Sequence, residues 1–144
     1  MCTFDRREYF AEAAVADEVC EHLLATAVRW DVEVIAYCFM PDHVHVLVEG
    51  RTESADCRKC VDVFRQVSGF HFRRAHGKRL WQDGYFDRVL RDEDATLTVV
   101  SYIVLNPVRA GVCRAASDYP LLGSSRYALS ELLTATEWDP HPLG

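Results

Sequence analysis

The sequence lacks the features of a membrane-embedded or secreted protein. It contains no run of eighteen apolar residues, the length that a membrane-spanning helix requires. A secretory signal peptide needs an apolar stretch near the N-terminus. The chain has charged residues there instead, namely Asp5, Arg6, Arg7 and Glu8. We therefore expect a soluble, cytoplasmic protein.

The sequence also lacks the regular cysteine spacing of a disulfide scaffold. Its six cysteines are irregularly placed in a chain that is 49% hydrophobic and can build a core without cross-links, so we expect reduced thiols. Cys57 and Cys60 form a C-x-x-C, but no second Cys/His pair follows at finger-like spacing, and helix-borne thiols are favoured over a zinc site. Internal repeats and low-complexity segments are absent as well. The 144 residues predict one domain, with residues 112–144 as a C-terminal extension.

The charge is unevenly distributed along the chain. The formal net charge is -6, which is unusual for a protein that binds nucleic acid. Residues 51–91, however, hold ten basic and five acidic residues, whereas the segments on either side are acidic. This central segment permits local phosphate binding in a molecule that repels polyanions elsewhere. The alternative is a solvated loop and helix end, where cations suit the helix dipole.

Hydrophobic periodicity and turn signals predict an α+β fold. The expected elements are the end of a strand at residues 1–4, a helix at 12–30, a hairpin of strands at 32–39 and 43–49, a helix at 55–75 capped by Ser54 or Asp56 and ended by Gly77, a loop and strand within 80–90, a helix at 93–105 capped by Asp92 and stopped by Asn106-Pro107, and a helix at 128–134. An antiparallel sheet with helices packed on it accommodates this order.

The stretch MPDHVHVLVE, residues 40–49, places two histidines on one face of a strand. Side chains alternate along a strand, so His43 and His45 project to one side, with their Cα atoms about 6.7 Å apart, and the valines between and after them project to the other. Two imidazoles on one face can share a metal ion. The alternative is that both are polar residues on the wetted face of a half-buried strand.

A second pair of polar residues lies on the helix that precedes Pro107. Tyr102 and Asn106 are four residues apart and share one helix face, about 6 Å from each other. A tyrosine hydroxyl can attack a phosphodiester when it is positioned beside a cation, and an asparagine oxygen can be a third ligand for Mg²⁺ or Mn²⁺. Alternatively, Asn106 is an ordinary C-terminal helix residue.

Four sequence blocks together resemble a known family. They are MPDHVHVLVE, FRQVSGFHFRR, LWQDGYFDRVLRDED and YIVLNPVRAG, and they occur in the family's order between residues 4 and 127. In this combination the chain resembles the single-tyrosine HUH transposases, most closely the REP-associated tyrosine transposase (RAYT) group.

The resemblance implies a ferredoxin-like HUH endonuclease fold and an enzyme that cleaves and rejoins single-stranded DNA near hairpins through a 5′-phosphotyrosine. By position, His43 and His45 correspond to the metal ligands, Tyr102 to the nucleophile and Asn106 to the third ligand. The implied cofactor is Mg²⁺ or Mn²⁺, and the implied partner is single-stranded or hairpin DNA, bound by a monomer or homodimer.

Residues of the basic segment are candidates for DNA contacts. Candidate phosphate ligands are Arg65, Arg73, Arg74, Lys78 and Arg79. Trp81, Tyr85 and Phe86 are candidates for stacking on unpaired bases, with burial in the core as the alternative.

The N-terminus departs from the family pattern, because the chain starts within what is usually a full strand. This predicts either that the start codon is assigned too late or that part of a sheet strand is missing. Two other functions compete with the active transposase: a domesticated or inactive hairpin-DNA-binding protein, and a metal hydrolase of small phosphoesters. The latter leaves the basic segment without a role.

Overall fold

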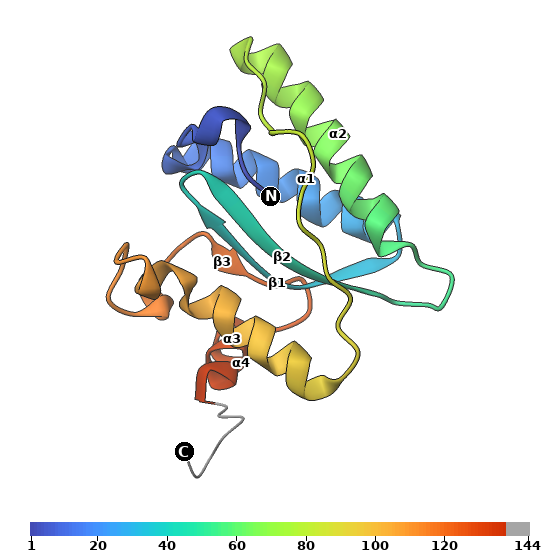
Figure 1. Cartoon of the computed structure of the whole chain (residues 1–144), viewed down its shortest axis with the longest axis vertical. Helices are drawn as coiled ribbons and strands as arrows, with labels where there is room; N and C mark the ends of the chain where they lie inside the picture. Colours follow the sequence, from blue (N-terminus) through green and yellow to red (C-terminus); the bar gives the residue numbers. More distant parts are fainter. Residues whose placement is uncertain (138–144) are drawn as a thin grey trace.

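In the computed structural model of the protein, which describes residues 1–137, an antiparallel sheet in the order β2-β1-β3 lies between two groups of helices (Figure 1). The helices are α1 (Ala13–Arg29), α2 (Cys57–His76), α3 (Glu93–Arg109) and α4 (Leu129–Thr134), and the strands are β1 (Val32–Met40), β2 (His43–Gly50) and β3 (Leu122–Gly123). Helices α1 and α2 cover one face of the sheet, and α3 and α4 cover the other (Figure 1). The α+β class predicted from the sequence is confirmed.

The alternation of side chains along β2 determines what each face of the sheet carries. Val44 is buried in the core that α1 and α2 share, and Val46 and Val48 pack against the same cluster. Leu47 instead packs in the second core, beneath α3. His43 and His45 have the same parity as Leu47, so the valine packing directs both histidines toward α3.

The hairpin is formed as predicted. Met40 pairs with His43 and Cys38 with His45, so Pro41 and Asp42 make the turn. A register irregularity between Val34 and Ala36 changes which side chains of β1 face each of the two cores. Helices cover both faces of the sheet, so β1 is buried on both.

Helices α1, α2 and α4 lie close to the predicted ranges. Asp56, rather than Ser54, caps α2, because its carboxylate accepts a hydrogen bond from the Lys59 N–H at 3.0 Å. Gly77 ends α2 at φ 67°, a left-handed conformation that favours glycine. All six cysteines are free thiols, and Cys60, 1% exposed, packs in the core, in agreement with helix-borne thiols.

The predicted end of α3 was wrong. Asp92 caps the helix as expected, but the helix continues through Pro107 to Arg109. Proline lacks an N–H, so near a helix end it removes only one hydrogen bond. The next turn still closes, with the Ala110 N–H donating to the Asn106 carbonyl at 2.9 Å. Burial of Asn106 and Pro107 on the sheet side favours this continuation.

The strand predicted within residues 80–90 was also wrong. Beyond a single bridge at Trp81, this segment is an extended connection that leads from α2 to α3 (Figure 1). Phe86 and Val89 are 93% and 76% exposed, so their apolar character does not reflect a place in the sheet. The free edge of β1 is taken instead by β3, in which Gly123 pairs with Tyr37. A Cβ on Gly123 would lie 2.6 Å from the Tyr37 hydroxyl, so the close approach requires glycine.

Residues 1–3 extend the sheet beyond β2, close to the strand end predicted at residues 1–4, and Phe4 begins a 3-10 helix (Phe4–Arg6). The Val44 N–H donates to the Met1 carbonyl at 2.9 Å, and Cys2 bridges His43. On the other side of this segment, Thr3 bridges Trp81. The start of β2, where the histidines lie, is therefore paired on its outer edge.

Candidate active site

Three aromatic rings meet between β2 and α3. The ring centroids of His43 and His45 are 4.9 Å apart and their planes are at 89°. The Tyr102 ring approaches from α3, with its centroid 5.6 Å from that of His45 at 88°. The structure thus brings together the two histidines and the tyrosine that sequence reasoning placed on separate elements.

Tyr102 and Asn106 differ in exposure although they share one face of α3. Tyr102 is 52% exposed, so a large substrate can reach its hydroxyl. Asn106 lies one turn further on and is only 9% exposed. A buried amide beneath an accessible phenol suits a positioning or ligand role for the asparagine and a reactive role for the tyrosine.

Asp42 fixes the orientation of His43. The Nδ1 of His43 lies 2.7 Å from the Asp42 carboxylate, which also accepts a hydrogen bond from the Arg6 Nε at 2.9 Å. Burial alone would raise the pKa of Asp42, but these hydrogen bonds from His43 and Arg6 outweigh it and lower the pKa. In the neutral tautomer that donates from Nδ1 to this carboxylate, Nε2 keeps a free lone pair.

His45 is neutral at neutral pH. Burial lowers its pKa to about 4, and His43 when protonated, the N-terminal amine and Arg109 act in the same direction. A neutral imidazole keeps the lone pair that a metal ion or a proton donor needs.

The donor set fits a divalent cation. Two imidazoles project from one face of β2, one of them oriented by a carboxylate, and the Asn106 amide lies on the facing helix. Within residues 1–137 no three His, Cys, Asp or Glu side chains are grouped to hold a metal. A metal bound here would therefore depend on Asn106 as its third protein ligand.

Arg109 belongs to the same site, and sequence reasoning missed it. Its guanidinium carbon lies 4.1 Å from the centroid of the Tyr102 ring, and its NH2 group donates to the Tyr102 carbonyl. Tyr102, Asn106 and Arg109 follow one another at i, i+4 and i+7, the spacing of one helix face. The spacing of these three residues can be read from the sequence. The helix predicted from the sequence ended before Pro107, however, and therefore did not include Arg109. Asp42 was missed because it was interpreted only as a turn residue.

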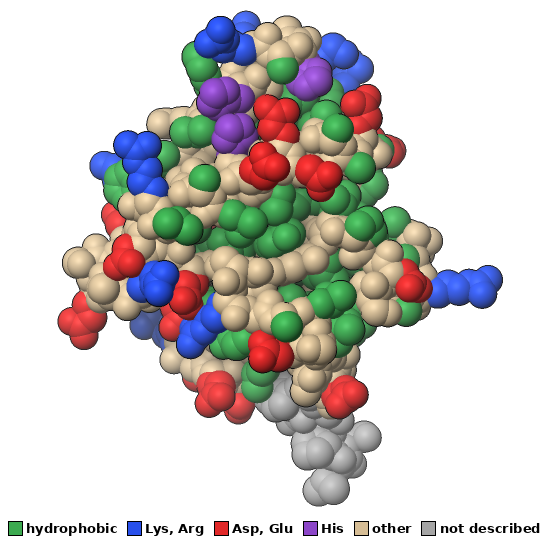
Figure 2. Space-filling view, turned by 180° about the vertical axis from the view of Figure 1, so that it is seen from behind, with side chains coloured by type: hydrophobic (Ala, Val, Ile, Leu, Met, Phe, Trp, Pro, Cys, Tyr) green, Lys and Arg blue, Asp and Glu red, His purple; other side chains and the backbone are tan. Residues whose placement is uncertain are grey.

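Four of the five candidate phosphate ligands gather at the end of α2. Arg73 and Arg74 lie in its last turn, and Lys78 and Arg79 follow it, all exposed. Figure 2 shows Lys and Arg side chains at this end of the molecule, beside a group of histidines. Arg65 differs, because its NH2 group donates to the Gln82 carbonyl at 2.6 Å and ties the extended connection to α2.

The expectation that Trp81 stacks on DNA bases is corrected by its burial. Trp81 is only 6% exposed and packs in the core formed with α1 and α2. Its indole N–H donates to the Ser68 hydroxyl at 3.0 Å, so both its apolar and polar parts are used internally. Phe86, in contrast, is free to meet a ligand at 93% exposure.

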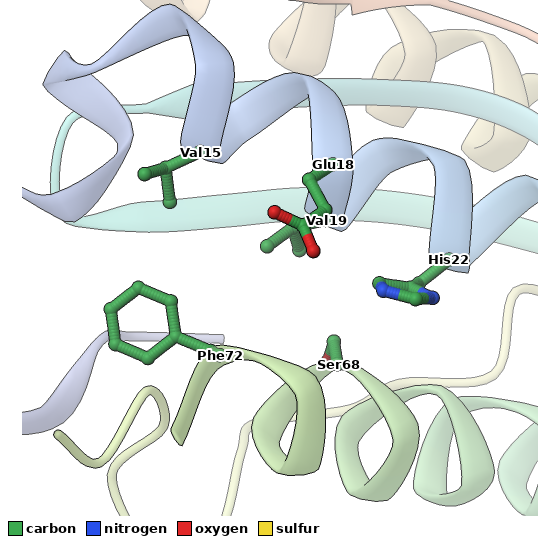
Figure 3. Close-up of a pocket in the computed structure, with 6 residues that line it drawn as sticks. All are labelled: Val15, Glu18, Val19, His22, Ser68 and Phe72. Atoms are coloured by element: carbon green, nitrogen blue, oxygen red, sulfur yellow. The ribbon is translucent and has the colours of Figure 1, made fainter. Parts of the chain in front are cut away.

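A small cavity lies away from these residues, between α1 and α2. Figure 3 shows Val15, Glu18, Val19 and His22 of α1 facing Ser68 and Phe72 of α2 around it. Its volume of about 10 Å³ is no more than one water molecule occupies. This cavity is a packing defect between helices and is not a substrate site.

Comparison with known proteins bears on the fold and the family. A solved structure, described as a REP-associated tyrosine transposase bound to a REP hairpin, has the same fold with a TM-score of 0.71 at 20% identity, covering 84% of this chain and 71% of that one. A Haemophilus influenzae protein described as a REP-associated tyrosine transposase is 22% identical, covering 87% of this chain and 73% of its own length. None of the helices in residues 1–137 is long and apolar enough to cross a membrane. The family model for "Transposase IS200 like" matches residues 1–106, and because this is well over half of the chain, the protein belongs to the IS200-like transposase family.

Proposed function

We propose that the protein is a metal-dependent tyrosine transposase that cleaves and rejoins single-stranded DNA near hairpins through a 5′-phosphotyrosine. The observation that carries the proposal is the meeting of Tyr102 with His45 and His43 across β2 and α3. The similar proteins described as REP-associated tyrosine transposases, one of them bound to a REP hairpin, support the substrate class.

In the cleavage step the Tyr102 oxygen attacks the scissile phosphorus. The phenol gives its proton to solvent, a bond forms between the tyrosine oxygen and phosphorus, and the bond from phosphorus to the 3′-oxygen breaks. The 3′-oxygen takes up a proton and leaves as a hydroxyl, while the 5′-phosphate stays on Tyr102. The half-exposed position of Tyr102 gives a DNA strand access to this oxygen.

Rejoining reverses the chemistry with a different strand. A second 3′-hydroxyl attacks the phosphotyrosine, its proton is released, and Tyr102 leaves as the phenol. The covalent intermediate keeps the phosphodiester bond energy, so no nucleotide cofactor is required.

His43, His45 and Asn106 would hold the divalent cation, Mg²⁺ or Mn²⁺. When bound, the cation supplies charge stabilisation to a non-bridging phosphate oxygen. The contribution of the chain is to present the two imidazoles in the required state. Asp42 orients His43, and burial keeps His45 neutral.

The DNA-binding surface combines the cationic end of α2 with the exposed ring of Phe86. Arg73, Arg74 and Lys78 are available for phosphates, and Phe86 is available for stacking on an unpaired base. Because its substrate is DNA, we expect the protein to act in the cytoplasm. We expect it to bind the DNA as a monomer or homodimer.

The test is covalent capture of single-stranded hairpin DNA in the presence of Mn²⁺. The wild-type protein should form an adduct that survives denaturation, and Tyr102→Phe should form none while it binds the same DNA with nearly unchanged affinity. The change removes one hydroxyl and keeps the ring packed against His45.

Tyr85→Phe is the matched control, because it also removes a tyrosine hydroxyl, one that hydrogen-bonds Asp62 at 2.8 Å outside the site. It should retain adduct formation. An adduct carried by Tyr85, or cleavage by Tyr102→Phe, would refute the assignment of the nucleophile. Tight hairpin binding without any adduct from the wild type would favour the inactive DNA-binding protein instead.

A further inference from the structure

We propose that Arg109 binds the scissile phosphate beside Tyr102 and holds the tyrosine ring in its attacking position. The inference rests on the proposed function, since it assigns a residue to the same DNA-cleaving site. It follows from the stripe that Tyr102, Asn106 and Arg109 form along α3.

Arg109 contacts the tyrosine directly. The guanidinium stacks over the Tyr102 ring at 4.1 Å and also donates to the Tyr102 backbone carbonyl. The same ring meets the His45 ring at 88°, with their centroids 5.6 Å apart. With contacts to Arg109 and His45, the phenol has little freedom to swing away from the histidine pair.

Most N–H donors of Arg109 have no partner among residues 1–137. A guanidinium has five N–H donors, and the Tyr102 carbonyl accepts from one NH2 group. Within the part of the chain that the structure describes, no carboxylate pairs with Arg109, whereas Arg6 and Arg126 each pair with a carboxylate of the β1-β2 hairpin. An exposed guanidinium with unused donors matches a phosphate group, which it can bind through two oxygens.

The charge of Arg109 also lies near the histidine pair. The Arg109 guanidinium lies 4.1 Å from the centroid of the Tyr102 ring, and that ring lies 5.6 Å from the His45 ring. A phosphate within reach of Tyr102 and His45 therefore also lies in the field of Arg109. In the transition state negative charge grows on the non-bridging oxygens, and a preorganised cation at that point stabilises it.

The experiment compares a charged and a neutral scissile linkage in a background that cannot cleave. Covalent capture on the wild-type protein first selects a hairpin oligonucleotide from a randomised single-stranded pool and maps its cleavage position. The same oligonucleotide is then made with a methylphosphonate there, which replaces one charged oxygen by a methyl group. Affinities of Tyr102→Phe and of Tyr102→Phe/Arg109→Met are measured for both DNAs.

With the ordinary phosphodiester, Arg109→Met should weaken binding about tenfold, the value of a charge-assisted hydrogen bond. With the methylphosphonate, the same change should alter affinity by less than about twofold, because the partner charge is gone. Arg109→Lys should recover part of the loss, since it restores the charge without the fork of donors. Arg114→Met, which removes an exposed arginine outside the α3 stripe, is the control and should affect both DNAs equally.

In the otherwise wild-type protein, Arg109→Met should slow adduct formation at saturating DNA about 100-fold. An equal loss of affinity for both DNAs would overturn the proposal and leave Arg109 with a structural role only. Unchanged adduct formation would overturn it too, while the wild-type adduct still supports the proposed function. Failure of the wild-type protein to capture any oligonucleotide would instead refute the proposed function, and the role of Arg109 with it.

Discussion

Replacing Asp42 by alanine should weaken divalent metal binding without unfolding the protein. The side chain of Asp42 makes two contacts, with the His43 Nδ1 at 2.7 Å and with the Arg6 Nε at 2.9 Å. Its backbone carbonyl, which accepts from the Thr3 N–H at 3.0 Å, remains in place in the variant. The hairpin and the strand pairing of residues 1–3 should therefore persist.

The magnitude follows from what the carboxylate does to His43. Without it, the ring is free to rotate and to place its proton on Nε2, the nitrogen needed for the metal. Loss of such an orienting partner typically lowers metal affinity about 10- to 100-fold, or about 1.4 to 2.7 kcal/mol. We expect a shift of this size in the Mn²⁺ dissociation constant, measured by calorimetric titration of the DNA-free protein.

Two further variants make the result interpretable. Asp42→Asn keeps an oxygen that can accept the Nδ1 proton and should lose less affinity than alanine does. Arg6→Met removes the outer cation, which is largely exposed, and should change Mn²⁺ affinity by less than about twofold. Equal Mn²⁺ affinity in Asp42→Ala and the wild type would refute the reasoning, as would a loss in Arg6→Met as large as in Asp42→Ala.

Three other predictions concern the DNA surface, the site and the core. Changing Arg73, Arg74 and Arg79 together to glutamine should lower affinity for single-stranded DNA. It should also reduce the slope of log affinity against log salt concentration by up to about 2. An unchanged slope would show that the DNA binds elsewhere on the protein. In metal-free buffer, the free energy of unfolding should fall as pH drops from 6.5 toward 4. The pKa of His45 is lowered to about 4 in the folded state, so the unfolded chain takes up the proton first. His45→Gln should flatten this part of the profile. Ser68→Ala should lower the free energy of unfolding in urea by about 1 to 2 kcal/mol, because the Trp81 indole N–H loses its acceptor in the core.

The sequence by itself determined the elements whose signal is local. Alternation within MPDHVHVLVE placed the valines on one face of β2 and the histidines on the other, and the structure packs Val44 against α1 and α2 accordingly. The i, i+4 relation of Tyr102 and Asn106 also needed no tertiary information. Caps such as Asp92 and Gly77 were readable because each acts on its own helix end.

Only the tertiary structure decided which apolar residues are core. Trp81 and Phe86 lie five residues apart in one aromatic run, yet one is 6% and the other 93% exposed. Nothing local distinguishes them. The difference arises because Trp81 pairs with Thr3 and packs beneath α2, whereas the chain after it leaves the sheet.

Tertiary packing also decided the extent of α3 and thereby the composition of the site. The local rule that proline stops a helix was overridden, because Asn106 and Pro107 are buried and the last turn loses only one hydrogen bond. The added turn brings Arg109 over the Tyr102 ring. Contacts between residues as distant as His45 and Tyr102 depend on how α3 crosses the sheet, which no local pattern encodes.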